Sequence, residues 1–352
     1  MLRRIVKAGV ANTLRWSGAS GLIGAHNGKA GMPLILGYHR VVEDFREHAG
    51  ISIAPMLIGL RTLEQQLDWL GRRYRFVDLG DAARVAASGS QEGTPVAAVS
   101  FDDGYRDVYE FAFPLLRRKG IPFAVFVITD FVGTPKLQAH DELYLLLSKA
   151  FAAWEEPRHK LAALLRDLDV DESALTKEVT RRDEAFSLTR VLLNQLSQKQ
   201  LQLVMDALRV TLDPANDRAG EFRSLDWGQI IALHKAGVTI GSHTCSHALL
   251  TNEPHQKALR EARDSRAILE QRLGTGVEHF AYPDGRFNRE ALGVVEEAGY
   301  RYAYTTCAHR DPVRPQLALP RRIMWEGACL GAFSSFSPSV MDCQVNGVFD
   351  FS

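Results

Sequence analysis

The sequence predicts an α/β barrel of parallel strands that is interrupted by a helical insertion. Short apolar runs alternate with segments of helical periodicity on both sides of a long helix-rich stretch, at about residues 133–223. This alternation is typical of parallel βα units. Each candidate catalytic side chain falls at the end of one of the apolar runs, and a parallel barrel gathers its active site at the carboxyl ends of its strands.

The first half of the predicted barrel precedes the insertion. The run at residues 96–99 is short and continuously apolar, which is typical of a parallel strand buried on both faces. Gly120 and Pro122 break the helix that follows it. The expected elements are a strand at 33–42, a helix at 63–70, strands at 76–77 and 96–101, a helix at 109–119 and a strand at 123–127.

The second half follows the insertion. We interpret residues 133–223 as helices at the rim of the barrel that shape substrate access and carry no ligand-like cluster. The expected elements beyond it are a helix at 227–236, a strand at 238–240, a helix at 253–273, a strand at 280–282, a helix at 290–298 and a strand at 302–304.

Three segments make up the predicted domain organisation: a helical segment at 1–32, the barrel domain at 33–330 and a tail at 331–352. The N-terminal segment mixes basic and apolar residues, which suits an amphipathic helix packed on the domain; the alternative is a peripheral membrane contact. The segment has no sustained apolar core for a signal peptide, and there is no apolar run of about 20 residues. We therefore expect a cytoplasmic protein, membrane-associated if this helix touches lipid.

Composition excludes several classes of protein. Lys+Arg and Asp+Glu balance at 42 each, so no global charge argues for nucleic-acid binding. The four cysteines are too sparse for a disulfide framework, which favours a reducing compartment.

Two short segments carry the chemistry. Asp102 and Asp103 end the strand at 96–101, and two adjacent strand residues can share a site only where the strand ends. His243 and His247 follow the strand at 238–240, and their spacing predicts one face of a helical turn, with Cys245 pointing away. Two histidines and one aspartate make a three-ligand metal site with an open position for water. The second carboxylate remains as a base, which outlines a metallohydrolase.

These segments resemble the motifs of the polysaccharide deacetylase family, the NodB-homology domain. Residues 100–104 are similar to its first motif and residues 243–247 to its second, while residues 280–285 look like its third. The resemblance runs from about residue 33 to about residue 325. It implies a distorted (β/α) barrel of the NodB type, with Asp102 as general base. It also implies that Asp103, His243 and His247 bind a divalent metal, most readily Zn²⁺.

The third motif departs from the family pattern. Many members carry an arginine that orients the base where this chain has Ala281. The resemblance implies that the backbone N–H of Tyr282 helps to bind the developing oxyanion. Asp284 or Arg286 would contact sugar hydroxyls, with a turn at residues 283–285 as the alternative.

No late Leu-x-His motif, which supplies the family's general acid, follows residue 304. His309 lies in an expected loop. Arg321 and Arg322 lie in a strand-like segment, where either can replace the missing arginine or contact substrate. His39, at the end of the first strand, is a further candidate for the acid or for a substrate contact.

The resemblance implies a hydrolase that removes N-acetyl groups from amino sugars of a polysaccharide or its precursor. Alternatives with the same site are an O-acetyl esterase and a deacylase of a lipid-linked or small amide substrate. A glycosidase is disfavoured because its two carboxyls must stand at least about 5 Å apart on either side of the scissile bond, whereas Asp102 and Asp103 are adjacent. A non-catalytic carbohydrate-binding barrel is the remaining alternative.

Overall fold

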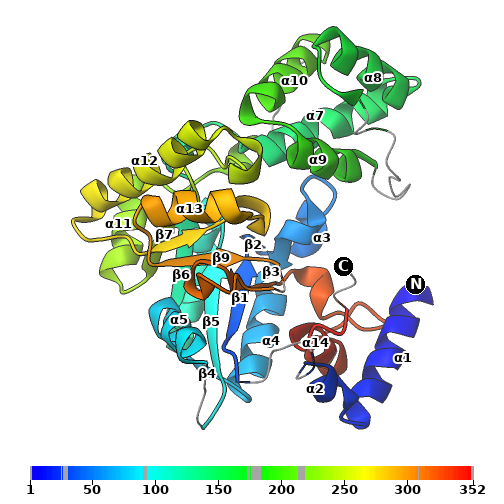
Figure 1. Ribbon diagram of the computed structural model, residues 1–352. Coiled ribbons are helices and arrows are strands. Elements are labelled where there is room, and N and C mark those ends of the chain that lie inside the picture. The colour runs from blue at the N-terminus through cyan, green and yellow to red at the C-terminus, as the bar shows by residue number, and fades with distance from the viewer. Residues whose placement is uncertain are drawn as a thin grey trace.

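The computed structural model describes residues 2–24, 26, 31–89, 93–172, 175, 184–212, 219–307 and 309–349. Its centre is a nearly closed barrel of parallel strands with helices around it (Figure 1). This confirms the predicted fold class. The strands are β1 (Leu34–Tyr38), β4 (Arg75–Phe76), β5 (Val96–Phe101), β6 (Phe123–Val127), β7 (Thr239–Ser242), β8 (His279–Ala281), β9 (Tyr302–Thr305), β10 (Leu319–Pro320) and β11 (Arg322–Ile323).

One short segment closes the barrel. The strands run in the order β10-β9-β8-β7-β6-β5-β1-β11, and β4 pairs with the start of β5. Leu319 of β10 pairs with Tyr304 of β9, whereas Arg322 of β11 pairs with Leu36 of β1. Because β10 and β11 are separated only by Arg321, residues 319–323 join the last strand of the barrel to the first.

Side chains alternate between two apolar clusters along the strands. Phe126 of β6 and Tyr304 of β9 lie in one cluster, with small residues such as Ala98 and Ala124. Phe101 of β5 lies in the larger cluster, which packs under the surrounding helices. These helices are α4 (Leu60–Gly71), α6 (Phe113–Lys119), α11 (Trp227–Lys235), α12 (His255–Leu273) and α13 (Arg289–Glu297); a π-helical segment, Val108–Ala112, precedes α6. Helix α5 (Leu79–Ser88) instead buries Leu79, Ala82, Ala83 and Ala86 in the first cluster.

The inserted helices are α7 (Ala139–Ala153), α8 (Pro157–Asp167), α9 (Glu184–Gln195) and α10 (Gln198–Thr211). They form a separate group above the barrel in Figure 1. They bury a core of their own, to which Leu147, Leu188 and Leu208 contribute, and Ile53 from the barrel side joins it. The inserted helices therefore hold themselves together by apolar burial and meet the barrel along one side.

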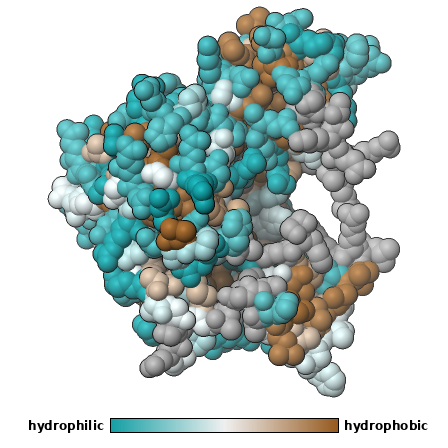
Figure 2. Space-filling view, viewed as in Figure 1, coloured by the Kyte–Doolittle hydropathy of each residue, from teal (hydrophilic) through white to brown (hydrophobic). Residues whose placement is uncertain are grey.

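Helices from both ends of the chain pack together. In α1 (Leu2–Trp16), Ala8 and Ala11 lie buried against Val340 and Cys343 of α14 (Pro338–Val345). The short helix α2 (Ala19–Gly24) joins them. The other face of α1 leaves Ile5, Val6, Val10 and Trp16 exposed, and Figure 2 shows apolar side chains gathered over this part of the molecule. Within the described ranges, no helix is long and apolar enough to cross a membrane.

A smaller element stands beside the mouth of the barrel. The short strand β2 (Arg40–Val42) pairs with β3 (Leu57–Gly59), and α3 (Phe45–His48) lies between them in the chain. Arg40 is buried and forms an ion pair with Asp107, 2.9 Å from Nε to Oδ2. This pair ties the segment after β1 to the segment after β5, and both segments carry candidate site residues.

Candidate active site

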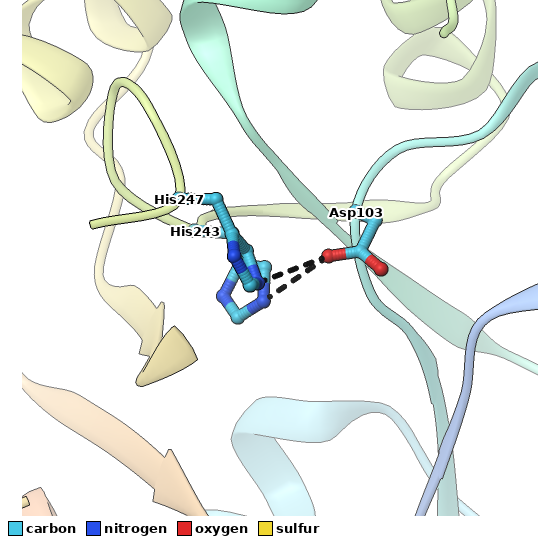
Figure 3. A group of neighbouring side chains, drawn as sticks. All are labelled: Asp103, His243 and His247. Atoms are coloured by element: carbon cyan, nitrogen blue, oxygen red, sulfur yellow. Dashed lines mark ion pairs between the residues drawn. The ribbon is translucent and has the colours of Figure 1, made fainter. Parts of the chain in front are cut away.

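Three side chains at the carboxyl ends of β5 and β7 converge on one point (Figure 3). The Nε2 atoms of His243 and His247 lie 3.4 and 3.5 Å from Oδ1 of Asp103. A tetrahedral zinc with bonds of about 2.0–2.1 Å needs ligand atoms roughly 3.3 Å apart, so the spacing fits a metal ion. Both carboxylate oxygens of Asp103 are buried, and neither has a hydrogen-bond partner among the described residues. These three residues therefore fit the metal that the sequence predicted.

The two histidines reach this point through a loop. The sequence predicted a helical turn, which is wrong: residues 243–249 are irregular, and Thr244 and His247 have left-handed backbones, with φ of 68° and 63°. Glu261 of α12 holds the loop, because its carboxylate accepts from the N–H groups of Cys245 and Ser246. Although this is a loop and not a helical turn, the ring centroids of His243 and His247 lie only 4.9 Å apart.

The surroundings of the ligand candidates shift their pKa values in different directions. Burial lowers the pKa of His243, but the contact with Asp103 and the charges of Asp102 and Asp103 outweigh burial and raise it. Nδ1 of His243 lies 2.8 Å from the carbonyl oxygen of Ala281, a hydrogen bond that leaves Nε2 facing Asp103. Burial lowers the pKa of His247 to about 3, so its imidazole is neutral near pH 7. Burial also raises the pKa of Asp103, but the facing imidazoles, His243 first, outweigh burial and hold that pKa well below its usual range.

Asp102 forms a buried ion pair with Arg321. The guanidinium is bidentate: Nη1 lies 2.6 Å from Oδ1 and Nη2 lies 2.7 Å from Oδ2. Burial raises the pKa of Asp102, but the charge of Arg321 and the nearby histidines outweigh it and hold the pKa below its ordinary value. A buried carboxylate that stays ionised beside a metal site can take a proton from water.

Arg321 thus occupies the role left open by Ala281. The sequence analysis left Arg321 and Arg322 as equal candidates. Arg321 contacts Asp102, whereas Arg322, in β11, is not among the residues that line the cavity described next. The arginine that pairs with Asp102 therefore lies on the segment that closes the barrel.

A cavity of about 420 Å³ opens onto these groups. Its polar floor comes from the barrel and includes His39, Asp102, the three metal-ligand candidates and Asp284. Its walls are largely apolar. The inserted helices and the loop that carries Ile53 and Met56 supply part of them, including Pro55, Phe186, Leu193, Leu196 and Leu201, and the barrel adds Leu249, Ile323 and Trp325.

His39 lies at the end of β1 and lines this cavity, as the sequence analysis proposed. Its Nδ1 atom is buried and has no hydrogen-bond partner among the described residues. Burial lowers the pKa of His39, against the opposing charges of Asp103 and Asp102. A ring nitrogen without a protein partner is free for a substrate atom.

Comparison with known proteins identifies this arrangement. The sequence model of the polysaccharide deacetylase family matches residues 89–161 and 186–303, which is more than half of the chain. The chain belongs to the polysaccharide deacetylase family. The gap in the match, residues 162–185, runs from the middle of α8 to the start of α9, so α7 and α10 fall inside the matched part.

Known relatives agree with this assignment. The chain is 27% identical over 136 residues to YxkH of Bacillus subtilis (strain 168), which is named as a polysaccharide deacetylase. The match covers 38% of this chain and about half of the relative, 48% of its length.

Solved structures show the same fold at low identity. Deacetylase PplD of Streptococcus pyogenes, solved with acetate, superposes with a TM-score of 0.53 at 16% identity, covering 88% of this chain and 96% of that one. IcaB of Ammonifex degensii gives 0.50 at 20% identity, with coverage of 83% and 91%. BC0361, a polysaccharide deacetylase of Bacillus cereus, gives 0.52 at 14% identity, with coverage of 89% and 68%.

The structure of this chain corrects the role predicted for Tyr282. Its N–H donates to the carbonyl of Tyr304 at 3.0 Å, so it is already used by the barrel ladder and cannot bind an oxyanion. The side chain is buried, and its hydroxyl donates to the carbonyl of Leu317. The third motif instead presents Asp284, whose backbone is left-handed, with φ of 54°, to the cavity. Arg286 points to the inserted helices and donates to the carbonyl of Asn194.

One residue that lines the cavity, His140, was missed by the sequence analysis. His140, on α7, stacks edge to face on His247, with 5.2 Å between the ring centroids. Nε2 of His140 lies 3.8 Å from Oδ2 of Asp103. No spacing signal joins His140 to either motif, because it comes from a helix whose position depends on tertiary packing. The insertion, in which we expected no ligand-like cluster, therefore brings one histidine next to the metal-ligand candidates.

Proposed function

We propose that this chain is a metal-dependent amide hydrolase that removes N-acetyl groups from amino sugars of a polysaccharide or its precursor. The observation that carries the proposal is the pairing of Asp102 with Arg321 directly beside the cluster of Asp103, His243 and His247. An ionised base next to three metal ligands, at the floor of a cavity, is the arrangement that hydrolysis of an acyl group needs.

Asp103, His243 and His247 would hold the ion, and their one carboxylate and two imidazoles suit zinc. When bound, the ion would polarise the acyl carbonyl and make water easier to deprotonate. His140 and the loop-holding Glu261 lie behind these ligands.

The other side chains divide the proton transfers. Asp102 takes a proton from the water that attacks the acyl carbon, and the bidentate contact with Arg321 keeps the carboxylate ionised and oriented. His39 faces the same cavity and donates a proton to the departing amine. Asp284, at the edge of the cavity, is placed to accept hydrogen bonds from sugar hydroxyls.

A second candidate substrate is favoured by the walls of the cavity. Met56, Phe186, Leu193 and Trp325 give the space above the polar floor an apolar lining. Sugar hydroxyls gain little from such a lining, whereas an acyl chain or a lipid-linked sugar would bury apolar surface there. A deacylase of a lipid-linked or small amide substrate is therefore the alternative within the same reaction class.

The test is release of acid from a matched set of substrates by the metal-loaded protein. The set contains an N-acetylglucosamine oligosaccharide, an O-acetylated oligosaccharide, and amides of glucosamine with acyl chains of increasing length. The proposal expects N-acetyl hydrolysis that is lost on chelation and restored by zinc. Faster hydrolysis of long acyl amides would favour the alternative. Hydrolysis of the O-acetyl substrate alone would contradict both.

A further inference from the structure

Two glutamines of the inserted helices hold the backbones of two metal-ligand candidates. Nε2 of Gln138, the residue that precedes α7, donates to the carbonyl of Asp103 at 2.9 Å. Nε2 of Gln198, the first residue of α10, donates to the carbonyl of His247 at 3.1 Å. The same type of contact therefore reaches the end of β5 and the loop after β7.

The two residues held in this way share an unusual backbone. Asp103 has φ of 69° and His247 has φ of 63°. Residues other than glycine seldom adopt this left-handed backbone conformation, and it persists where the surroundings hold it. A hydrogen bond to the carbonyl of such a residue fixes the peptide plane and hence the direction of its side chain.

A third contact reaches the side chain of Asp103. Oδ1 faces the metal-ligand histidines, whereas Oδ2 faces Nε2 of His140 at 3.8 Å. The same Nε2 lies 2.6 Å from the hydroxyl of Tyr105, and that hydroxyl donates to Oδ2 of Asp141 at 2.6 Å. All four side chains are buried. His140 is thus fixed from behind, and it stands next to the carboxylate oxygen that does not face the two histidines.

We propose that the inserted helices set the geometry of the metal centre through three positioning residues, Gln138, His140 and Gln198. This inference rests on the metal centre described under the proposed function. Groups behind metal ligands commonly contribute about 10- to 100-fold to metal affinity, because they fix the orientation of the ligand atoms. The insertion is then a part of the metal site and more than a wall of the cavity.

The test compares zinc affinity in full-length variants by competition with a chromophoric chelator. Q138M and Q198M keep the volume of the side chain and remove the donating amide. Q202M is the matched control, because Gln202 lies on the exposed face of α10 and bonds only to Asp206 of the same helix in the described structure. We expect each of Q138M and Q198M to weaken zinc binding by about 3- to 10-fold, their combination by more, and Q202M to leave it unchanged.

His140 is tested with two substitutions. H140A should weaken zinc binding by about 10- to 100-fold, and H140Q should recover part of the loss because its amide can reach the position of Nε2. The spectrum of the cobalt-substituted protein adds a readout that a purely structural role would not move: the visible bands should change in H140A and in Q198M. H159A, at an exposed histidine of α8, is the control.

The outcomes separate the two proposals. A wild-type protein that binds no zinc would overturn the metal centre and this inference together. A wild-type protein that binds zinc, with D103A empty but Q138M, Q198M and H140A matching wild type in affinity and cobalt spectrum, would overturn this inference alone. If H140A does not fold, H140Q and Y105F, which keep the volume of the core, decide the question.

Discussion

The barrel and the inserted helices contribute to the site in different ways. Every group proposed to touch the reacting atoms lies on the barrel: His39 follows β1, Asp102 follows β5, and the two histidines follow β7. The inserted helices contribute apolar walls and hydrogen bonds to groups that the barrel already carries. The comparison teaches that strand ends fix the identity of the chemistry, while the insertion determines access and the accuracy of the ligand positions.

The largest effect is expected from the barrel histidines. H243A and H247A each remove one of three protein ligands, so zinc should be lost and hydrolysis should fall to the level of the chelated enzyme. Metal content per chain and activity are measured together. Full metal content in both variants would show that the ion binds elsewhere. The contrast between the barrel and the inserted helices would then lose its basis.

A smaller effect is expected at the base. D102N keeps the shape of the side chain but cannot accept a proton, so turnover should fall by about 10²- to 10⁴-fold while zinc is retained. Turnover is compared with metal content measured on the same sample. Near-normal turnover in D102N would move the base to another residue.

A smaller effect, on substrate binding, is expected from shortening a side chain in the apolar wall of the cavity. L193A shortens a cavity-lining side chain of α9 and should raise KM for a long-acyl amide by about 5- to 20-fold, since it removes apolar contact worth roughly 1–2 kcal/mol. L203A, at an exposed position of α10, is the control. Zinc affinity should stay unchanged in both variants. A drop in zinc affinity in L193A would mean that the walls and the metal centre cannot be separated.

The smallest effect on catalysis is expected at the far end of the barrel. His279 begins β8, and burial lowers its pKa to about 4. The unfolded chain therefore binds more protons between pH 4 and 6.5, so this histidine makes the folded state lose stability as pH falls through that window, by up to about 3 kcal/mol.

H279N tests this group because it removes the titration and leaves a polar side chain near Tyr304, which His279 bonds at 2.9 Å. The free energy of unfolding of H279N minus that of wild type is measured from pH 4 to 7. The difference should shift in favour of H279N as pH falls, with turnover at pH 7 near wild type. A difference independent of pH would show that His279 titrates normally in the folded chain.

The positions of the main barrel strands along the chain and the metal-ligand candidates could be predicted from the sequence, because both depend on local signals. An apolar run followed by Asp102 and Asp103 predicts a strand end without knowledge of its neighbours. The loop of His243 and His247 was mispredicted because the backbone between its two left-handed residues is held by Glu261, a partner on α12. Spacing alone cannot distinguish that loop from a helical turn.

Other errors have the same physical origin. The choice between Arg321 and Arg322 depends on the register of β11 against β1, since neighbouring residues on a strand point to opposite sides. Tyr282 was misassigned because its N–H is used by a ladder bond to β9. The contacts of His140, Gln138 and Gln198 depend on how the inserted helices dock, and no motif encodes that docking.

Barrel closure has a consequence for the order in which the protein becomes competent during synthesis. Asp102 precedes Arg321 by 219 positions, and at common rates of translation roughly 10–40 s separate their emergence from the ribosome. Until then the nascent chain carries the Asp102 carboxylate without the positive charge of Arg321, and its barrel is not yet closed. Residues 319–323 supply both Arg321 and the closure of the barrel. A chain that terminates before residue 321 therefore lacks the ion pair of Asp102, even where the loop of His243 and His247 has formed. The ion pair of Asp102 with Arg321 and the closed barrel therefore form together, late in synthesis.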